Sequence, residues 1–148
     1  MDAPTPETPK PVALWNPNAA ALWSVIFTPV FGAYLHALNW RALGDSERET
    51  ASMTWVYGGG LMLVLHLLIE VLATGHSADS VSQVIGFAFL LAWYFASGHA
   101  QAKLVKEKFG HSFPRKPWKQ PLLMGLAGFG VYIALMVAIG VVIGLRNL

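Results

Sequence analysis

The chain has 148 residues, of which 55% are hydrophobic and only 12% are charged, and its formal net charge is +2. Because an average soluble domain carries roughly 25% charged residues, this composition favours a membrane protein, and the small net charge gives no reason to expect nucleic-acid binding. The chain contains no cysteine, which excludes a disulfide framework, a thiolate metal site and a cysteine nucleophile.

The chain begins with a proline-rich stretch, MDAPTPETPKP. Such a composition has too little apolar surface to form a core, and the stretch lacks the basic region with which a signal peptide begins. We therefore expect residues 1–14 to form a disordered tail. Residues 15–148 are expected to form a single transmembrane helical domain.

Four apolar runs follow the tail, and each is close to the roughly 20 residues that a helix needs to cross a bilayer. Helices also satisfy their own backbone hydrogen bonds in lipid, which open strands do not. The sequence therefore predicts an all-α integral membrane bundle of four transmembrane helices, with spans at about 19–38, 53–73, 81–101 and 121–145.

The first of these runs contains Thr28-Pro29 at its centre. Proline removes one backbone hydrogen bond and kinks a helix. The alternative to four spans is therefore three spans with a re-entrant or interfacial first segment. That alternative would place the N-terminus in the cytoplasm.

The connection between the first two runs carries two signals for helix ends. Gly44 suits a left-handed C-terminal cap, and it is followed by Ser46-Glu-Arg-Glu49, which fits a capping box. We expect the second helix to begin at this box.

Three stretches in the first third of the chain share a pattern: Trp15-Asn-Pro-Asn-Ala-Ala20, Phe27-Thr-Pro-Val-Phe-Gly-Ala-Tyr-Leu35 and Asn39-Trp-Arg-Ala-Leu-Gly44. This pattern resembles a segment of uncharacterised small bacterial integral membrane proteins. The resemblance implies a location in the bacterial inner membrane, and it implies no activity.

The second run contains His66 and Glu70, which lie four residues apart and therefore on one helix face. A carboxylate within a bilayer is costly and is a candidate for a functional residue. The pair could exchange protons or contribute to a metal site. In the plainer interpretation, Glu70 reaches water at the headgroups and His66 is its hydrogen-bond partner.

His36 and His99 are expected at similar depth near the cytoplasmic ends of the first and third helices. Two histidines on facing helices are the arrangement that holds a haem in a membrane bundle. The alternative is that both are ordinary interfacial residues. Haem is therefore an open possibility, and no other cofactor is predicted.

A basic segment separates the third and fourth runs. By the positive-inside rule, it places loop 99–120 in the cytoplasm and, with four spans, both termini in the periplasm. Basic residues beside a membrane also attract anionic lipid. The predicted contacts with anionic lipid or an acidic partner are Lys103, Lys106, Lys108, Arg115, Lys116 and Lys119.

The fourth run is rich in small residues, which let helix backbones approach closely in lipid. We expect them to pack against the chain's own helices, and self-association is the alternative. The residues are Gly130, Ala134, Ala138, Gly140 and Gly144.

These features favour a non-enzymatic accessory subunit or helix-packing scaffold. Its partners would be the lipid bilayer and a larger membrane complex. One alternative is a small oligomeric transporter or proton-handling protein that uses His66 and Glu70. The other is a haem-binding membrane redox subunit.

Overall fold

The computed structural model describes residues 12–72 and 77–146, and within these ranges it is all-helical, as predicted. An isolated parallel bridge joins Leu14 to Arg115, and the described ranges contain no β-strand. The helical elements are α1 (Pro17–Phe27), α2 (Pro29–Ala42), α3 (Ser46–Leu72), α4 (Ser77–Trp93), the π-helical turn η1 (Tyr94–Gly98), α5 (His99–Phe109) and α6 (Lys119–Arg146). Residues 1–11 of the predicted tail lie outside the described residues.

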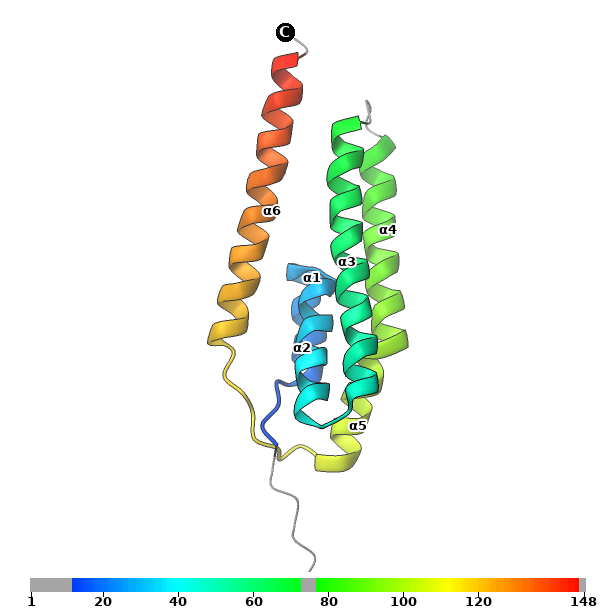
Figure 1. Ribbon diagram of the computed structural model, residues 1–148, viewed down its shortest axis with the longest axis vertical. Coiled ribbons are helices and arrows are strands. Elements are labelled where there is room, and N and C mark those ends of the chain that lie inside the picture. Colours follow the sequence, from blue (N-terminus) through cyan, green and yellow to red (C-terminus); the bar gives the residue numbers. More distant parts are fainter. Residues whose placement is uncertain (1–11, 73–76, 147–148) are drawn as a thin grey trace, which may run out of the picture.

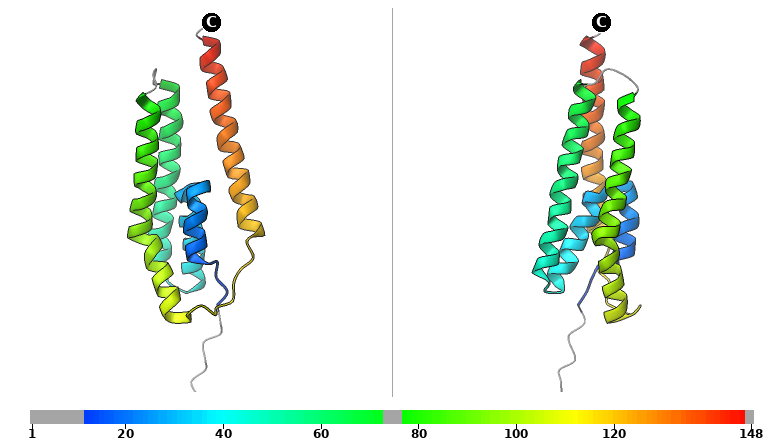
Figure 2. Two further views of the ribbon diagram at one scale, coloured as in Figure 1. Left: turned by 180° about the vertical axis from the view of Figure 1, so that it is seen from behind. Right: turned by 90° about the vertical axis from the view of Figure 1, so that its right-hand side faces the viewer.

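The helices form an elongated molecule, and most of the helices lie together at its lower end (Figure 1). Helix α3 runs beside the continuous rod of α4, η1 and α5, whereas α6 stands on the other side of the molecule. The two short helices α1 and α2 occupy only the lower half of the space between them, as the two other views also show (Figure 2). The upper half therefore consists of the long helices alone.

The first apolar run forms two helices instead of the expected single helix over residues 19–38. Thr28 separates them with φ 87° and ψ 157°, a backbone region that is almost exclusive to glycine. Pro29 follows at the start of α2 and has no N–H with which to extend the ladder of α1. The chain turns back here, so that Pro17 at the start of α1 lies beside His36 in α2. This path is a helical hairpin, and the re-entrant alternative describes it better than a kinked span does.

The N-terminal segment lies at the same end of the molecule as the basic loop. The amide of Leu14 donates to the carbonyl of Pro114 at 3.0 Å, and the amide of Lys116 donates to the carbonyl of Leu14 at 2.9 Å. The indole of Trp15 donates to the carbonyl of Pro117 at 3.1 Å. These segments therefore lie at one end of the molecule, because the hairpin returns the chain to the end from which it started. With four spans the sequence placed them on opposite sides of a membrane, and the sidedness itself stays a prediction.

The turn between α2 and α3 confirms one predicted cap and corrects the other. Gly44 has φ 76°, the left-handed conformation expected of a C-terminal cap. Helix α3 begins at Ser46 as predicted, but the side chain that caps it belongs to Asp45, whose Oδ1 accepts from the amide of Arg48 at 3.0 Å. The carboxylate therefore performs the role that the sequence assigned to the serine hydroxyl.

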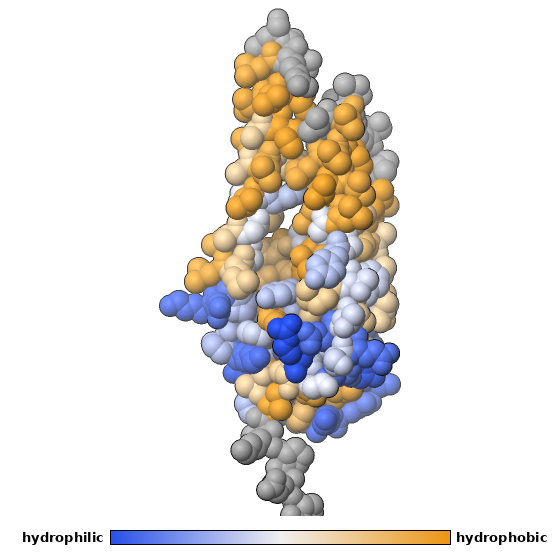
Figure 3. Space-filling view, in the orientation of Figure 1, coloured by the Kyte–Doolittle hydropathy of each residue, from blue (hydrophilic) through white to orange (hydrophobic). Residues whose placement is uncertain are grey.

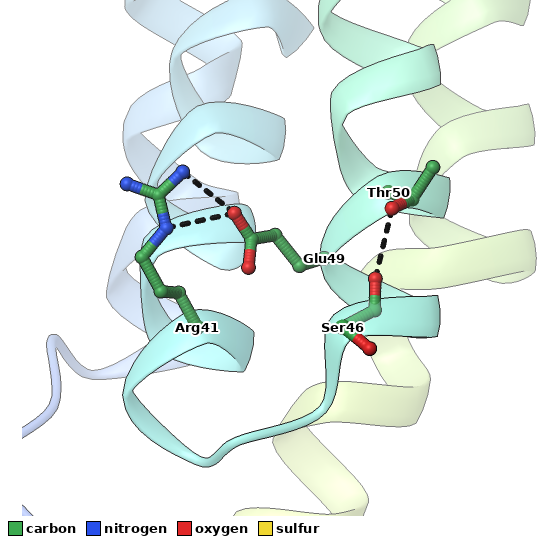
Figure 4. Close-up of polar contacts among 4 residues, drawn as sticks. All are labelled: Arg41, Ser46, Glu49 and Thr50. Atoms are coloured by element: carbon green, nitrogen blue, oxygen red, sulfur yellow. Dashed lines mark hydrogen bonds and ion pairs between the residues drawn. The ribbon is translucent and has the colours of Figure 1, made fainter.

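An ion pair closes the same turn (Figure 4). The Nε of Arg41 donates to Oε1 of Glu49 at 2.7 Å, and Nη2 lies 2.6 Å from the same oxygen. The hydrogen bond and the charge of Glu49 raise the pKa of Arg41 above its usual value. Because this arginine is exposed, the pair fixes the direction of the turn more than it stabilises the fold.

Among the described residues, two helices are long and apolar enough to cross a membrane, Ser46–Ile69 within α3 and Lys119–Leu145 within α6. The most apolar 18-residue stretch of each has a mean hydropathy of 1.5 and 2.5, respectively. They contain most of the predicted span at 53–73 and all of the predicted span at 121–145, and residue 73 lies outside the described residues. Figure 3 shows the division of the surface: hydrophobic residues cover the upper part, and hydrophilic residues gather at the lower end.

Candidate functional site

A network of buried polar groups holds the hairpin to α5, and we call it the polar clasp. Its centre is Asn39, whose Oδ1 accepts from the amide of Trp15 at 3.0 Å. The Nδ2 of Asn39 donates to the carbonyl of Trp15 at 2.8 Å and to Oε1 of Gln101 at 3.1 Å. Gln101 in turn donates to the carbonyl of His36 at 2.9 Å, and Nε2 of His36 lies 3.2 Å from the carbonyl of Pro17.

The clasp joins three segments that are far apart in the sequence: the N-terminal segment, α2 and α5. The side chains of Asn39, Gln101 and His36 are fully buried, so each of their polar atoms needs a partner to offset the loss of water. Because a carbonyl can only accept, the contact with Pro17 requires the proton of His36 to be on Nε2. The amides of Asn39 and Gln101 are therefore satisfied within the clasp. Nδ1 of His36 is buried and has no hydrogen-bond partner among the described residues.

An aromatic contact and a close helix crossing complete this core. The ring of Trp93 meets that of His36 edge-on, with 5.4 Å between the centroids. Helices α1 and α2 approach so closely that a Cβ on Gly32 would overlap Oγ of Ser24 and come within 2.6 Å of Trp93. Ser24 itself donates to the carbonyl of Ala20 at 2.9 Å. Only glycine therefore fits at this crossing.

A cavity of about 430 Å³ lies between the hairpin, α3 and α6, and we call it the lateral cleft. Its wall contains no charged residue. One end is formed by Trp15 and Gln120, near the hydrophilic end of the molecule, and Figure 3 shows the surface hollowed between α6 and the other helices. Residues from deeper in the cleft include Phe27, Phe31, Leu63, Gly128, Phe129 and Tyr132.

A second cavity of about 490 Å³ lies across the hairpin tip, toward α3 and α4. Thr28 contributes to both cavities. His66 lines the second one together with Gln83, and its ring stacks on Tyr132 of α6 with 6.3 Å between the centroids. The side chain of Glu70 lies outside the described residues, so the predicted pairing of His66 with Glu70 stays a prediction.

The structure does not bring the two candidate haem ligands into one site. His36 is fully buried in the polar clasp. His99 is exposed on α5, with its ring 6.2 Å from that of Tyr94. Within the described ranges, no group of three or more histidine, cysteine, aspartate or glutamate side chains could hold a metal ion.

The six predicted basic residues lie on α5, on the loop after it and at the start of α6. Lys103 pairs weakly with Glu107 at 4.0 Å. The ammonium of Lys116 lies 4.3 Å from the ring centroid of Trp15, and the guanidinium of Arg115 lies 5.7 Å from that of Phe113. The remaining members, Lys106, Lys108 and Lys119, are exposed.

The small residues of α6 named by the sequence lie on an uncovered part of the helix. A Cβ added at Gly130, Gly140 or Gly144 would meet no atom of the described residues within 4 Å. Ala134 and Ala138 are exposed. The role of these residues in helix packing, within the chain or between chains, stays a prediction.

Sequence reasoning missed Asn39 and Gln101 as the pair that joins the hairpin to α5. They are separated by 62 positions, and no local pattern connects residues at such a distance. The available signal was the presence of two amide side chains close to the ends of apolar runs, where each needs a partner once it is buried.

No family model matches the chain, and neither a curated protein nor a solved structure shows significant similarity to it.

Proposed function

We propose that this chain is a non-catalytic membrane scaffold, with α3, the rod of α4 and η1, and α6 crossing the bilayer. In this proposal the hairpin of α1 and α2 enters the membrane from the side on which the basic loop after α5 lies, and it returns to the same side. The uncovered side of α6 binds another membrane component. The resemblance of the first third of the chain to small bacterial membrane proteins supports the inner membrane as the location.

The observation that carries the proposal is the exposure of α6. None of its most apolar 18-residue stretch is buried against the rest of the chain, although its mean hydropathy is 2.5. Contiguous apolar surface on this scale is unfavourable in water and typical of a segment that faces lipid or a partner. Exposed side chains along the helix include Leu126, Val131, Leu135, Val137, Val141 and Leu145.

The orientation of the protein in the membrane follows from the basic loop after α5 and from the hairpin. Basic residues concentrate in cytoplasmic loops, so the loop after α5 belongs in the cytoplasm. Because Leu14 pairs with that loop, the N-terminal segment belongs there too. The C-terminal end of α6 then lies in the periplasm, which gives an odd number of crossings.

The chain contains no cysteine, so in a single-cysteine variant only the introduced residue can react with a maleimide, and its labelling reports the topology directly. We expect Val12→Cys and Ser112→Cys to react with an impermeant maleimide from the same side of the membrane, and Asn147→Cys to react from the opposite side. A four-span bundle would instead place Val12→Cys with Asn147→Cys. Release of the protein by alkaline carbonate would contradict membrane insertion altogether.

The scaffold role is tested on the small-residue stripe of α6. We expect the wild-type protein, purified in mild detergent, to have a particle mass above that of one chain, and Gly140→Leu with Gly144→Leu to lower it to one chain. Gly60→Leu is the matched control, because a Cβ at Gly60 of α3 also meets nothing within 4 Å. Equal masses for all three proteins would contradict binding through α6.

A proton-handling transporter is the second candidate, favoured by the place of His66 in the wall of the second cavity. An ionisable residue at this depth is the kind that proton relays use. Proton flux into proteoliposomes that is lost in His66→Gln and in Glu70→Gln would support it. Flux equal to that of empty liposomes would remove it.

A further inference from the structure

The lateral cleft extends from the hydrophilic end of the molecule, where the loop after α5 lies, into the part that is covered by hydrophobic residues. At its near end are Trp15 and Gln120, and at its far end are Phe129 and Tyr132. Its volume of about 430 Å³ is within the range of pockets that bind small molecules, roughly 300–1,000 Å³. An occupant must therefore be apolar over most of its length.

Two lysines mark the near end of the cleft. The ammonium of Lys116 lies 4.3 Å from the ring centroid of Trp15, which forms part of the wall. Lys119 is the first residue of α6 and directly precedes the wall residues Gln120 and Pro121. The wall itself carries no charge, and these two lysines place positive charge beside its near end.

The carboxylates that form ion pairs in the described part of the chain do so with cations other than these two lysines. Asp45 and Glu49 pair with Arg48 and Arg41 at the turn between α2 and α3. Glu107 pairs with Lys103 on α5. No ion pair involving Lys116 or Lys119 occurs among the described residues, which leaves a positive field at the mouth of the cleft.

We propose that the lateral cleft binds one acyl chain of an anionic phospholipid, whose phosphate lies against Lys116 and Lys119. The combination of a long apolar wall with two cations at one end fits an amphiphile with an anionic head. A free phosphate makes no use of the apolar wall, and a zwitterionic lipid gains less from the two cations. The inference rests on the proposed membrane insertion and adds a specific lipid site to it.

The experiment is native mass spectrometry of the full chain in mild detergent, supplied with equal amounts of phosphatidylglycerol and phosphatidylcholine that carry the same acyl chains. We expect the wild-type protein to retain one phosphatidylglycerol in preference to phosphatidylcholine. Each basic residue near an anionic lipid contributes about 1 kcal/mol, so two of them correspond to a preference of about 30-fold. No preference in the wild-type protein overturns the proposal.

Two pairs of variants test separately the binding of the lipid headgroup and the binding of the acyl chain. Lys116→Gln with Lys119→Gln is expected to abolish the preference for phosphatidylglycerol, whereas Lys106→Gln with Lys108→Gln on α5 preserves it. Gly128→Leu fills the cleft and is expected to lower retention of both lipids at least tenfold. Gly130→Leu is its control, because it adds the same side chain to the same helix outside the cleft wall.

Equal lipid retention by the Gly128→Leu and Gly130→Leu proteins overturns the proposal. So does a change of oligomeric state in Gly128→Leu without a change in lipid retention, because the cleft would then be an interface between proteins. Neither result contradicts membrane insertion, which the cysteine labelling tests separately.

Discussion

The hairpin and α6 are both apolar in sequence, yet they are held in opposite ways. The hairpin is short, crosses α3 closely and is anchored by buried amides and one histidine. Helix α6 is 28 residues long and leaves most of its side chains uncovered. The difference teaches that hydropathy alone does not say whether an apolar segment forms part of a core or faces the surroundings.

The physical basis of the difference is the number of polar groups that have to be satisfied. A long helix satisfies its own backbone, so α6 needs no partner inside a bilayer. The hairpin breaks its ladder at Thr28 and ends twice within the molecule, which leaves backbone groups that other segments must pair with. The polar clasp supplies partners for the main chain of Trp15, Pro17 and His36.

The largest expected effect comes from placing the same side chain in both regions. Gly32→Leu would force apart α1 and α2, because even a Cβ there overlaps Ser24, and we expect it to cost about 3 kcal/mol or more. Gly130→Leu meets nothing within 4 Å and should change stability by less than about 1 kcal/mol. Unfolding in SDS, followed by tryptophan fluorescence, measures the stability of both variants. Equal losses of stability would contradict the difference between the hairpin and α6.

A smaller loss is expected when the clasp is opened. Asn39→Leu removes the partner of the amide and carbonyl of Trp15 and of Oε1 of Gln101, at a cost of about 2 kcal/mol. Adding Gln101→Leu should cost less than a second independent loss, because it removes one of the stranded groups. Gln120→Leu, an exposed amide on α6, serves as the control in the same unfolding assay. Additive losses would show that the two amides do not act together.

The smallest effect, and one of opposite sign, is expected at the hairpin tip. Thr28→Gly should stabilise the protein by about 1 kcal/mol, because glycine adopts φ 87° without the strain that a β-branched residue carries there. Thr54→Gly, in the regular helix α3, should instead destabilise it by about 0.3 kcal/mol. Thermal unfolding in detergent compares the two, and a loss at both positions would show that the threonine side chain is needed at the tip.

The sequence predicted the helical class and the position of the longest apolar helices. The spans 53–73 and 121–145 were predicted from length and composition, and residues 53–72 and 121–145 lie in α3 and α6. It also predicted the left-handed cap at Gly44, because few residues other than glycine adopt a positive φ. These features depend on neighbours in the chain, so they could be inferred without a fold.

The candidate site was predicted only in part. The basic residues Lys116 and Lys119 were identified as contacts for anionic lipid, but the apolar cleft beside them was not. That cleft is formed by side chains from the hairpin, α3 and α6, which no single stretch of sequence brings together. Likewise, Gly130, Gly140 and Gly144 were expected to pack internally, and the described residues leave them uncovered, whereas Gly125 of the same helix packs against Phe27 and Phe31.

The sequence by itself determined which segments are apolar, where the turn at Gly44 separates two helices, and which loop is basic, because each depends on short-range chemistry. Only the tertiary structure decided that the first run folds back on itself. That decision required contacts between Asn39 and Gln101 and between Leu14 and the loop after α5. Hydrogen bonds between such distant positions form only when the helices are packed together. Their partners therefore produce no periodic pattern in the sequence from which they could be predicted.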